Sequence, residues 1–559
     1  MKNVDYLQKS LVEINRNLSM KKPNVILTGK DLTIQDILSV AIRKTKVLFT
    51  DDPRILNKMN ASYGQMIEQI EKGIPIYGCN TGYGARASQI LNKGTLEKRL
   101  EISKLISESI VHTDIGVGPV LSKEIVRAAI LIRINMLVNG VSAVRIQDLD
   151  IFRKTLNKNI TPVVNVYGGL GASGDLPQNS RVLSAMRQLS GVKVYFEDDK
   201  IGEAKQILTR NGIPRLLLEP KAGLGLVNGD NFSTAAATLI VNELIEFILI
   251  SDVLGALVVE VLRGSNRSFH PFLSAIRPHP CQLELSNLYL YLLKGSKLAY
   301  QELKGHSIRP NGIKIQDAYS LRCIIQSEGL NRELIKWALQ TITINANSVS
   351  DNPLWVSPEF VTEGEKPWQW VSGGNFFAGH MGEVIDTMRK IITRLIKRND
   401  RHLHRMVCPH ENNGLTANLS DKQALSMCAF KGIQLQSGMF DVYSMLLAMP
   451  VTTMFGIHEE ANQDITPHAM TSAILAWENL KLLKYSLAMN LLAVMQAVDL
   501  RGGPELLSPR TRPLYHFIRL KSKYVTRERP LNNDIEVLAK TIENGEMIKI
   551  LREKVLQDL

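Results

Sequence analysis

Long helical stretches in the second half of the chain constrain its fold more than any other feature of the sequence. From about Leu226 onward, apolar residues recur at helical spacing with few interruptions. These stretches exceed the usual length of a helix in a globular protein, and several are apolar nearly all round. We therefore expect them to be buried in a large bundle. The expected helices span residues 231–264, 316–350, 376–405, 420–447 and 466–500.

The first half of the chain is interrupted more often, by glycine and other turn residues. Leu100–Ile110 and Lys123–Val138 show helical spacing, whereas Val192–Phe196 has the pattern of a strand. A chain of 559 residues also exceeds what one hydrophobic core usually serves. The sequence thus predicts a mainly α protein, with a smaller mixed α/β N-terminal region over residues 1–215 and a long-helix bundle over residues 216–559.

The formal net charge of +13 raises the question of nucleic acid as a partner. Lys and Arg are spread along the chain and no nucleic-acid motif accompanies them, so we expect no such partner. A solvated basic surface or the attraction of an anionic substrate accounts for the charge. The most apolar long segment, Leu244–Leu262, contains Glu246, Asp252 and Glu260, which favours a buried helix over a membrane span.

The cysteines and the N-terminal residues bear on the cellular compartment. The five cysteines are odd in number and form no CxxC pair, which favours a reducing compartment over a disulfide framework. The first residues of the sequence are charged throughout and lack an apolar signal core. We therefore expect a cytoplasmic protein that is not embedded in a membrane.

The segment Tyr167–Leu176, with the sequence YGGLGASGDL, is the most informative for chemistry. Its four glycines within seven positions allow backbone conformations and close approaches that other residues forbid. The spacing is neither a phosphate-binding P-loop nor a GxGxxG fingerprint. A plain turn remains one interpretation. The other is cyclisation, in which the amide nitrogen of Gly174 attacks the carbonyl of Ala172 and water is lost there and from Ser173.

The remaining chain resembles the family of histidine, phenylalanine and tyrosine ammonia-lyases and the related aminomutases. The family signature GASGDL is present at residues 171–176, and further blocks follow the family's order. The resemblance covers roughly residues 25 to 520. The further blocks are YGCNTGYG (77–84), GLGLVNG (223–229), IQDAYSLRC (315–323), NSVSDNPL (347–354), SGGNFFAG (372–379), NQD (462–464) and QAVDLRG (496–502).

The resemblance implies a prosthetic group and a base. Ala172, Ser173 and Gly174 would form 4-methylidene-imidazol-5-one (MIO) autocatalytically, without a metal. The substrate amine would add to this electrophile, and a base would then remove a weakly acidic proton from the β-carbon. Tyr77 matches the family's base, although a packed turn tyrosine is the alternative. Because a free tyrosine is a poor base near neutral pH, we expect positive charge or helix N-termini to lower its pKa.

The resemblance also implies how the substrate is held. Arg322 matches the residue that grips the substrate carboxylate, for which its forked guanidinium is suited, and a structural salt bridge is the alternative. Tyr319 lies three residues earlier on the same helical face and belongs to the predicted catalytic set. Asn228 resembles the contact to the MIO carbonyl and the substrate. The remaining predicted contacts are Phe376 as a ring-packing wall, and Asn352 and Gln463 as polar partners with an equally good structural interpretation.

His112 and Thr113 bear on the choice of substrate. His112 falls where tyrosine-specific members of the family carry histidine, and a histidine there suits a phenol hydroxyl. Histidine-specific members place their histidine one residue later, where this chain has Thr113. The sequence favours tyrosine, then phenylalanine or histidine. A histidine that is satisfied within its own helix is the alternative interpretation.

Three departures from the family pattern suggest an unusual substrate or an altered fate for the released ammonia. Asp230 follows Asn228-Gly229 where the family has threonine. The position of a Glu or Gln that faces the substrate amine falls on Tyr443. The usual continuation after Asp175-Leu176 is replaced by Pro177-Gln178-Asn179. A zinc site is not expected in the cluster His402, His404, Cys408 and His410, because its spacing is unsuitable.

By resemblance, the fold has the fumarase/aspartase-like architecture and forms a homotetramer whose active sites draw on several chains. Tyr77 would come from one subunit and the Tyr319–Arg322 segment from another. The predicted activity is non-oxidative deamination of an aromatic L-amino acid to an aryl acrylate and ammonia. Two alternatives stay open: a 2,3-aminomutase that returns ammonia to the β-carbon, and a non-catalytic scaffold, which Asp230 and Tyr443 suggest.

Overall fold

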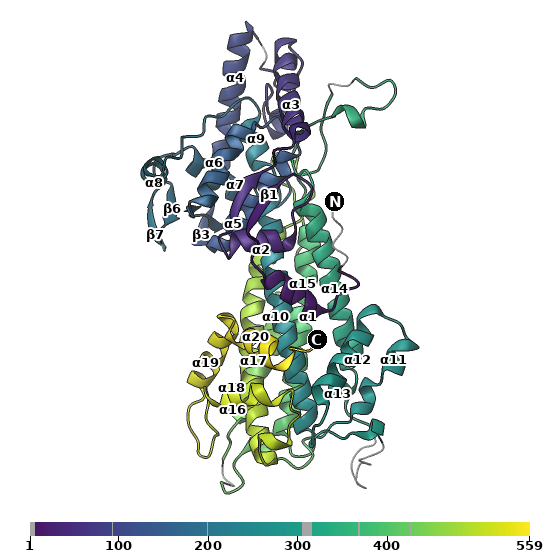
Figure 1. Cartoon of the computed structure of the whole chain (residues 1–559). Helices are drawn as coiled ribbons and strands as arrows, with labels where there is room; N and C mark the ends of the chain where they lie inside the picture. The colour runs from purple at the N-terminus through teal and green to yellow at the C-terminus, as the bar shows by residue number, and fades with distance from the viewer. Residues whose placement is uncertain (1–5, 92, 198, 305–315, 367–368, 425–426) are drawn as a thin grey trace.

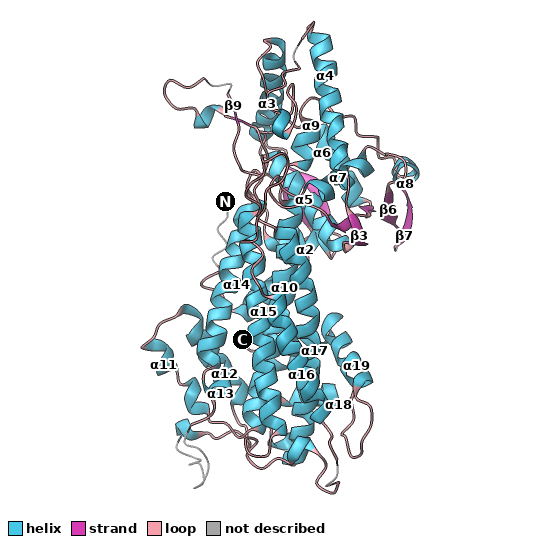
Figure 2. Cartoon of the chain, turned by 180° about the vertical axis from the view of Figure 1, so that it is seen from behind, coloured by secondary structure: helices cyan, strands magenta, loops and turns pink. Residues whose placement is uncertain are grey.

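Five long helices run side by side and give the molecule its elongated shape (Figures 1 and 2). The computed structural model describes residues 6–91, 93–197, 199–304, 316–366, 369–424 and 427–559. Within the bundle, α15 packs against α10, α16 and α17, and α10 also packs against α17. The five helices are α10 (Asn231–Val261), α14 (Ile324–Ala346), α15 (Gly379–Val407), α16 (Lys431–Leu447) and α17 (Ala469–Arg501).

The mainly α fold predicted from the sequence is confirmed, with two large differences in helix bounds. The bounds of the other expected long helices differ by three residues or fewer. The helix expected over 316–350 is divided at Cys323 into the short α13 (Tyr319–Arg322) and α14, and it ends at Ala346. It ends there because the Asn347 side chain turns to bond the backbone of Leu32. The helix expected over 420–447 begins only at Lys431, because Ala429 adopts a positive φ of 35° just before it.

The N-terminal part of the chain combines helices with short strands, as expected. Its central helix α5 spans Lys123–Val138, which agrees with the prediction, and nearly every residue of it is buried. This helix packs against α10 of the bundle, so the buried apolar side chains of the two parts form one cluster. The division of the chain at residue 215 stays a prediction. Other helices of this part are α1 (Leu11–Ser19), α2 (Ile34–Ala41), α3 (Pro53–Glu71), α4 (Leu96–Ser109), α6 (Ile146–Asn157), α7 (Leu176–Met186), α8 (Ala204–Arg210) and α9 (Ala222–Val227).

The strands are short and pair in small sheets. Strand β1 (Asn24–Leu27) pairs in parallel with β2 (Lys46–Phe49). All other pairs are antiparallel, and the expected strand near Val192 is confirmed as β6. These pairs are β3 (Val117–Val120) with β5 (Asn165–Tyr167), β4 (Thr161–Pro162) with β6 (Lys193–Phe196), β6 with β7 (Lys200–Glu203), and β8 (Leu354–Trp355) with β9 (Trp370–Val371).

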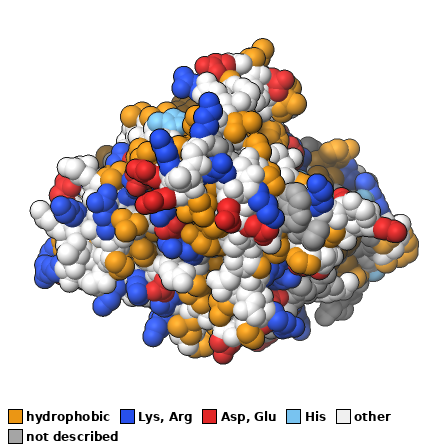
Figure 3. Space-filling model, turned by 90° about the horizontal axis from the view of Figure 1, so that it is seen from above, with side chains coloured by type: hydrophobic (Ala, Val, Ile, Leu, Met, Phe, Trp, Pro, Cys, Tyr) orange, Lys and Arg blue, Asp and Glu red, His pale blue; other side chains and the backbone are white. Residues whose placement is uncertain are grey.

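The remaining helices pack around the lower part of the bundle (Figure 1). Within the ranges described, none of the helices combines the length and apolarity needed to span a membrane. Seen from above, basic side chains lie scattered among acidic and apolar ones (Figure 3). The helices are α11 (Pro271–Ala275), α12 (Pro280–Leu293), α18 (Arg512–Arg519), α19 (Asn532–Glu543) and α20 (Glu546–Ile550).

Candidate active site

The Ala172-Ser173-Gly174 segment lies in a tight turn between β5 and α7. Gly171 and Gly174 adopt positive φ angles of 77° and 71°, and bridge pairing joins them across the turn. Two neighbours hold the turn from outside, since the Ala378 N–H donates to the Gly171 carbonyl at 3.0 Å and the His468 N–H donates to the Leu170 carbonyl at 2.9 Å. The segment is thus bent and fixed by the residues that begin α15 and α17.

The backbone of Gly174 packs directly on Gly229. A Cβ atom at Gly174 would lie 2.5 Å from the Gly229 carbonyl carbon, so only glycine fits. The Gly229 carbonyl accepts hydrogen bonds from the Asp175 N–H and the Asn179 side chain, both at 2.9 Å. On the other side, a Cβ at Gly229 would collide with the buried guanidinium of Arg133. Gly229 is therefore packed tightly between the backbone of Gly174 and the guanidinium of Arg133.

A cavity of about 410 Å³ opens beside Ser173. Eight of the predicted site residues line it, although they come from seven separate segments of the chain. Strand-to-helix and helix-to-helix loops supply most of them, as is usual for functional residues on a rigid scaffold. The eight residues are Tyr77, His112, Thr113, Ser173, Asn228, Asn352, Phe376 and Gln463.

Tyr77 is half-buried, and its phenolic oxygen accepts a hydrogen bond from the Gly84 N–H at 2.9 Å. Burial raises the pKa of Tyr77 above its ordinary value, the Gly84 N–H opposes this, and the charge of Glu459 raises it further. The expectation of a lowered pKa is therefore wrong for the single chain. The physical reason is burial of the phenol, and the cavity lining, as far as the structure describes it, adds a carboxylate but no lysine or arginine that would oppose it.

Gln463 connects the Ala172-Ser173-Gly174 turn to an acidic residue. Its Nε2 donates to the Ser173 hydroxyl at 3.0 Å and to the Glu459 carboxylate at 3.0 Å. Asn462 donates to the same Glu459 oxygen at 2.8 Å. The sequence analysis missed Glu459, because three successive positive φ angles at Glu459, Glu460 and Ala461 turn it back into the cavity. Glutamate and alanine rarely adopt that conformation, so nothing in the sequence indicated a turn at these positions.

Asn228 and Asn352 form the polar floor of the cavity. The Asn228 Nδ2 donates to the Asn352 carbonyl at 3.4 Å, and the Asn352 side chain accepts from the Gly373 N–H at 2.8 Å. The Asn228 Oδ1 is buried and has no hydrogen-bond partner among the described residues. Because buried polar atoms are normally satisfied, this oxygen indicates a place for a ligand group.

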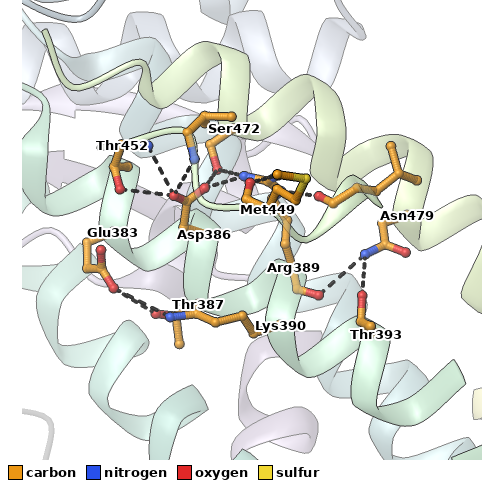
Figure 4. Close-up of polar contacts among 12 residues, drawn as sticks. Glu383, Asp386, Thr387, Arg389, Lys390, Thr393, Met449, Thr452, Ser472 and Asn479 are labelled. Carbon is orange, nitrogen blue, oxygen red and sulfur yellow. Dashed lines mark hydrogen bonds and ion pairs between the residues drawn. The ribbon is translucent and has the colours of Figure 1, made fainter. Parts of the chain in front are cut away.

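A buried ion pair anchors the loop that carries Glu459 and Gln463 (Figure 4). Asp386 pairs with Arg389 on α15 and accepts from the backbone N–H groups of Val451 and Thr452 at 3.0 and 3.2 Å. Arg389 donates to the carbonyls of Leu447 and Met449, both at 2.6 Å. The end of α16 and the start of the following loop are thereby fixed to α15.

Asp230 lies behind the cavity rather than in it. Its carboxylate is buried and accepts from the Asn345 side chain at 2.9 Å. Burial raises the pKa of Asp230 to about 6, while the nearby Asn345, Ser350 and Arg133 oppose this shift. The carboxylate that the sequence placed near the site therefore supports the start of α10 and does not line the cavity.

Three predicted site residues lie far from this cavity within the chain. Tyr319 and Arg322 belong to α13 and Tyr443 to α16, both in the lower part of the bundle, whereas α7 and α9 lie in the upper part (Figures 1 and 2). The Arg322 guanidinium stacks on the Tyr319 ring, with 4.5 Å between the Cζ atom and the ring centroid. Tyr443 packs against the hydrophobic core. Their roles in substrate binding stay predictions.

The histidines at the end of α15 do not assemble a metal site in the part of the chain that the structure describes. His402 is fully buried, and its Nε2 bonds the Ser320 carbonyl at 2.8 Å. His404 is exposed on the other side of the helix.

Comparison with known proteins shows which family has this sequence and fold. A model of the aromatic amino acid lyase family matches residues 32–520. A phenylalanine ammonia-lyase of Nostoc punctiforme is 31% identical over 520 residues, which are 90% of this chain and 88% of the relative. A histidine ammonia-lyase of Myxococcus xanthus is 30% identical over 95% of this chain and 99% of its own length. The crystal structure of a tyrosine aminomutase from Streptomyces globisporus superposes with a TM-score of 0.84 at 27% identity, over 95% and 99% of the two chains.

The fold is that of the ammonia-lyases and aminomutases, and the protein is a carbon–nitrogen lyase. The family match spans most of the chain and includes the loop, the cavity and the long helices, so the chain belongs to the aromatic amino acid lyase family. The resemblance drawn from the sequence motifs is confirmed. These relatives act on different amino acids by name, so they do not separate tyrosine, phenylalanine and histidine.

Proposed function

We propose that this protein deaminates an aromatic L-amino acid without oxidation, with tyrosine favoured, to give an aryl acrylate and ammonia. The observation that carries the proposal is the position of Ser173, which lies in a tightly packed glycine turn and borders the same cavity as Tyr77. Ring closure joins the Gly174 nitrogen to the Ala172 carbonyl carbon. It releases two waters, one from that carbon and one from the Ser173 side chain.

The residues around the turn fit a 4-methylidene-imidazol-5-one group. Close packing of Gly174 on Gly229 favours the approach that ring closure requires, and the Gln463 Nε2 is available to donate to the ring carbonyl. The Asn228 Oδ1, which has no partner among the described residues, is an acceptor suited to the substrate's amino group. Once formed, the group supplies an electrophilic carbon that makes the substrate's amino group a better leaving group. Its formation requires no metal.

Tyr77 is placed to remove the proton from the substrate β-carbon. The described lining of its cavity contains no lysine or arginine, and the Gly84 N–H donates to the oxygen that would carry the negative charge. The positive charge that favours the phenolate would therefore come from a neighbouring subunit.

His112 supports tyrosine as the substrate. Its Nδ1 lies 2.8 Å from the Ser109 carbonyl, and because a carbonyl only accepts, Nδ1 carries the proton in the neutral ring. Nε2 is then an acceptor, and because His112 lines the cavity we assign it to the hydroxyl of a phenol. The Thr113 hydroxyl is already used, since it bonds the Ile110 carbonyl at 2.8 Å.

The distribution of apolar and basic groups supports a homotetramer with shared sites. The cavity lining has no described cation for a carboxylate, whereas Arg322 lies at the other end of the bundle. A row of apolar side chains on α16 and the loop after it is exposed in the single chain, which is typical of a surface covered by another subunit. These side chains are Leu435, Met439, Val442, Met445, Leu446, Met449, Met454, Phe455 and Ile457. The expected cytoplasmic location remains part of this proposal.

The product decides this proposal. Purified protein is supplied with tyrosine, phenylalanine or histidine in turn, and products are separated by chromatography and weighed by mass spectrometry. An aryl acrylate from tyrosine with free ammonia supports the lyase. No product from any of the three, together with an intact mass that has not lost two waters, would refute it.

A 2,3-aminomutase is the second candidate, since the chain is similar to a tyrosine aminomutase over 95% of its length. The same assay separates the two activities, because a mutase yields β-tyrosine in place of the acrylate. His112→Phe tests the choice of substrate. Loss of the acceptor should lower the ratio of kcat/KM for tyrosine over phenylalanine by about tenfold or more. An unchanged ratio would remove His112 from substrate selection.

A further inference from the structure

The short helix α13 carries Tyr319 and Arg322 but is too short to hold its own shape. A helix of four residues closes barely one turn, so it depends on neighbours for stability. Tyr319 is 72% exposed and offers little burial of its own. Nevertheless the Arg322 guanidinium keeps a defined position over the Tyr319 ring. Contacts from elsewhere in the chain must therefore fix this turn.

His402 provides the first of these contacts. It is fully buried on α15, and its Nε2 lies 2.8 Å from the Ser320 carbonyl in the middle of the turn. Since the carbonyl only accepts, Nε2 carries a proton. Burial, with the nearby charge of Arg398, lowers the pKa of His402 to about 3, so the ring is neutral and Nδ1 bears no proton. Nδ1 is buried without a partner in the described part of the chain. The hydrogen bond to the Ser320 carbonyl is therefore the one that this imidazole makes within the described residues.

Arg405 provides the second contact, one helical turn further along α15. Its Nε donates to the Ser320 hydroxyl at 3.2 Å, while its Nη1 pairs with Glu411 at 2.9 Å. His402 and Arg405 thus grip the backbone and the side chain of the same residue. Because they project from a helix of 29 residues within the bundle, they tie the turn to a rigid support.

Arg322 has the features of a group kept ready for a ligand. No hydrogen-bond partner of its buried Nε is found among the described residues, although arginine nitrogens are normally satisfied when buried. Stacking on Tyr319 restricts the guanidinium plane, which is the arrangement that favours bidentate binding of a carboxylate. The position of Arg322 depends on Ser320, two residues earlier.

We propose that His402, assisted by Arg405, is a positioning residue that sets the Tyr319–Arg322 turn so that Arg322 meets the substrate carboxylate in a neighbouring subunit's cavity. The inference rests on the proposed function and extends it to side chains that touch neither the substrate nor the reacting atoms. It also gives a role to a histidine that the sequence presented as a possible metal ligand.

Three variants test it. His402→Leu removes the donor to Ser320, His402→Gln keeps an N–H at a similar reach, and His404→Leu is the matched control on the exposed side of the same helix. Steady-state kinetics give kcat and KM. Calorimetry gives the Kd of the aryl acrylate and of its uncharged carboxamide, so a readout exists that does not require turnover.

We expect His402→Leu to raise KM and the Kd of the acrylate by about ten- to a hundredfold, the range that a displaced binding group produces. The Kd of the carboxamide should change little, because only the carboxylate needs Arg322. His402→Gln should restore most of the affinity, and His404→Leu should behave like the native protein. Adding Arg322→Met to His402→Leu should cost little more than either change alone.

Equal weakening of acid and amide would overturn the inference, as would a His402→Gln variant as impaired as His402→Leu, or full additivity with Arg322→Met. These failures differ from failure of the proposed function. In that case the native protein itself would yield no product from any aromatic amino acid and would bind the acrylate no better than the carboxamide.

Discussion

The amide of Gln463 donates a hydrogen bond to the hydroxyl of Ser173 at 3.0 Å, although 290 positions separate the two residues. The same nitrogen also donates to Glu459. One side chain thus links the turn before α7 to the loop between α16 and α17, and through Glu459 it reaches the surroundings of Tyr77.

Tyr77→Phe should lower the rate of product formation by about 10²- to 10⁴-fold, the usual contribution of a positioned general base. The ring at Ala172-Ser173-Gly174 should still form, so the intact mass should show the loss of two waters. Tyr83→Phe is the control: it removes a hydroxyl from the same cavity, one that bonds the Ile106 carbonyl. Similar losses in both variants would mean that Tyr77 is not the base.

Glu459→Gln should shift the alkaline rise of the pH–rate profile to lower pH. The negative charge of Glu459 raises the pKa of Tyr77, so its removal lowers that pKa and makes the phenolate available at lower pH. The profile of log kcat/KM against pH measures the shift. Glu460→Gln is the control, because Glu460 is exposed and does not line the cavity. A shift to higher pH would contradict the electrostatic assignment.

Gly174→Ala should prevent ring formation. The added Cβ would lie 2.5 Å from the carbonyl carbon of Gly229, and the φ of 71° is also unfavourable for alanine. Intact-mass measurement should give the mass of the unmodified chain. Gly191→Ala is the control for the cost of a positive φ alone, since Gly191 has a φ of 77° but no atom within 4 Å of a Cβ, and this variant should still form the ring. Failure of the ring to form in Gly191→Ala, or ring formation in Gly174→Ala, would contradict the role of close packing between Gly174 and Gly229.

Asp230→Asn should gain stability relative to the native protein as the pH rises. Burial raises the pKa of Asp230 to about 6, so the folded state binds its proton more tightly than the unfolded state. The native protein therefore loses stability as the pH rises from about 4 to about 6, and asparagine does not. The relative gain is up to about 3 kcal/mol. Thermal midpoints at pH 4.5 and 7 measure it, with the exposed Asp51→Asn as control, and a gain toward acid pH would refute the sign.

Asp386→Asn should destabilise the protein and reduce its activity. Removing one partner of a buried ion pair costs about 3–5 kcal/mol, and here it would also free the loop that carries Glu459 and Gln463. Thermal unfolding and kcat/KM measure the two effects. Glu383→Gln, on the same helix, removes an exposed ion pair with Lys390 but keeps an oxygen that can accept from Thr387, and should change little. Equal effects of both changes would contradict the anchoring role.

Sequence periodicity was sufficient to predict the long helices, because burial inside a bundle leaves an apolar pattern at 3.6-residue spacing. Lys123–Val138 was predicted with its observed bounds for the same reason. The start of α16 was missed because a single positive φ at Ala429, which no glycine signals, ends the preceding loop. The local sequence pattern predicts that a helix is present, but it does not show the tertiary contacts that determine where the helix begins and ends.

Most residues that line the cavity were predicted from family motifs, and lining residues outside those motifs were not predicted. His112 and Gln463 were found because their blocks match the family, whereas Glu459 depends on an unusual left-handed turn. The pKa of Tyr77 could not be foreseen, since it depends on burial and on a charge brought close by tertiary structure. The separation of Arg322 from the cavity within one chain likewise appears only in three dimensions.

The separation of Arg322 from the cavity within one chain has a consequence for cells that produce two variants of this protein. If Arg322 of one copy binds the substrate in the cavity of another copy, the Tyr77 and the Arg322 of a single chain belong to two different active sites. A mutation of Tyr77 and a mutation of Arg322 in that chain then inactivate different sites. Two inactive variants, one changed at Tyr77 and the other at Arg322, would then regain activity when they are produced together. Some mixed assemblies would contain an active site with an intact Tyr77 from one variant and an intact Arg322 from the other.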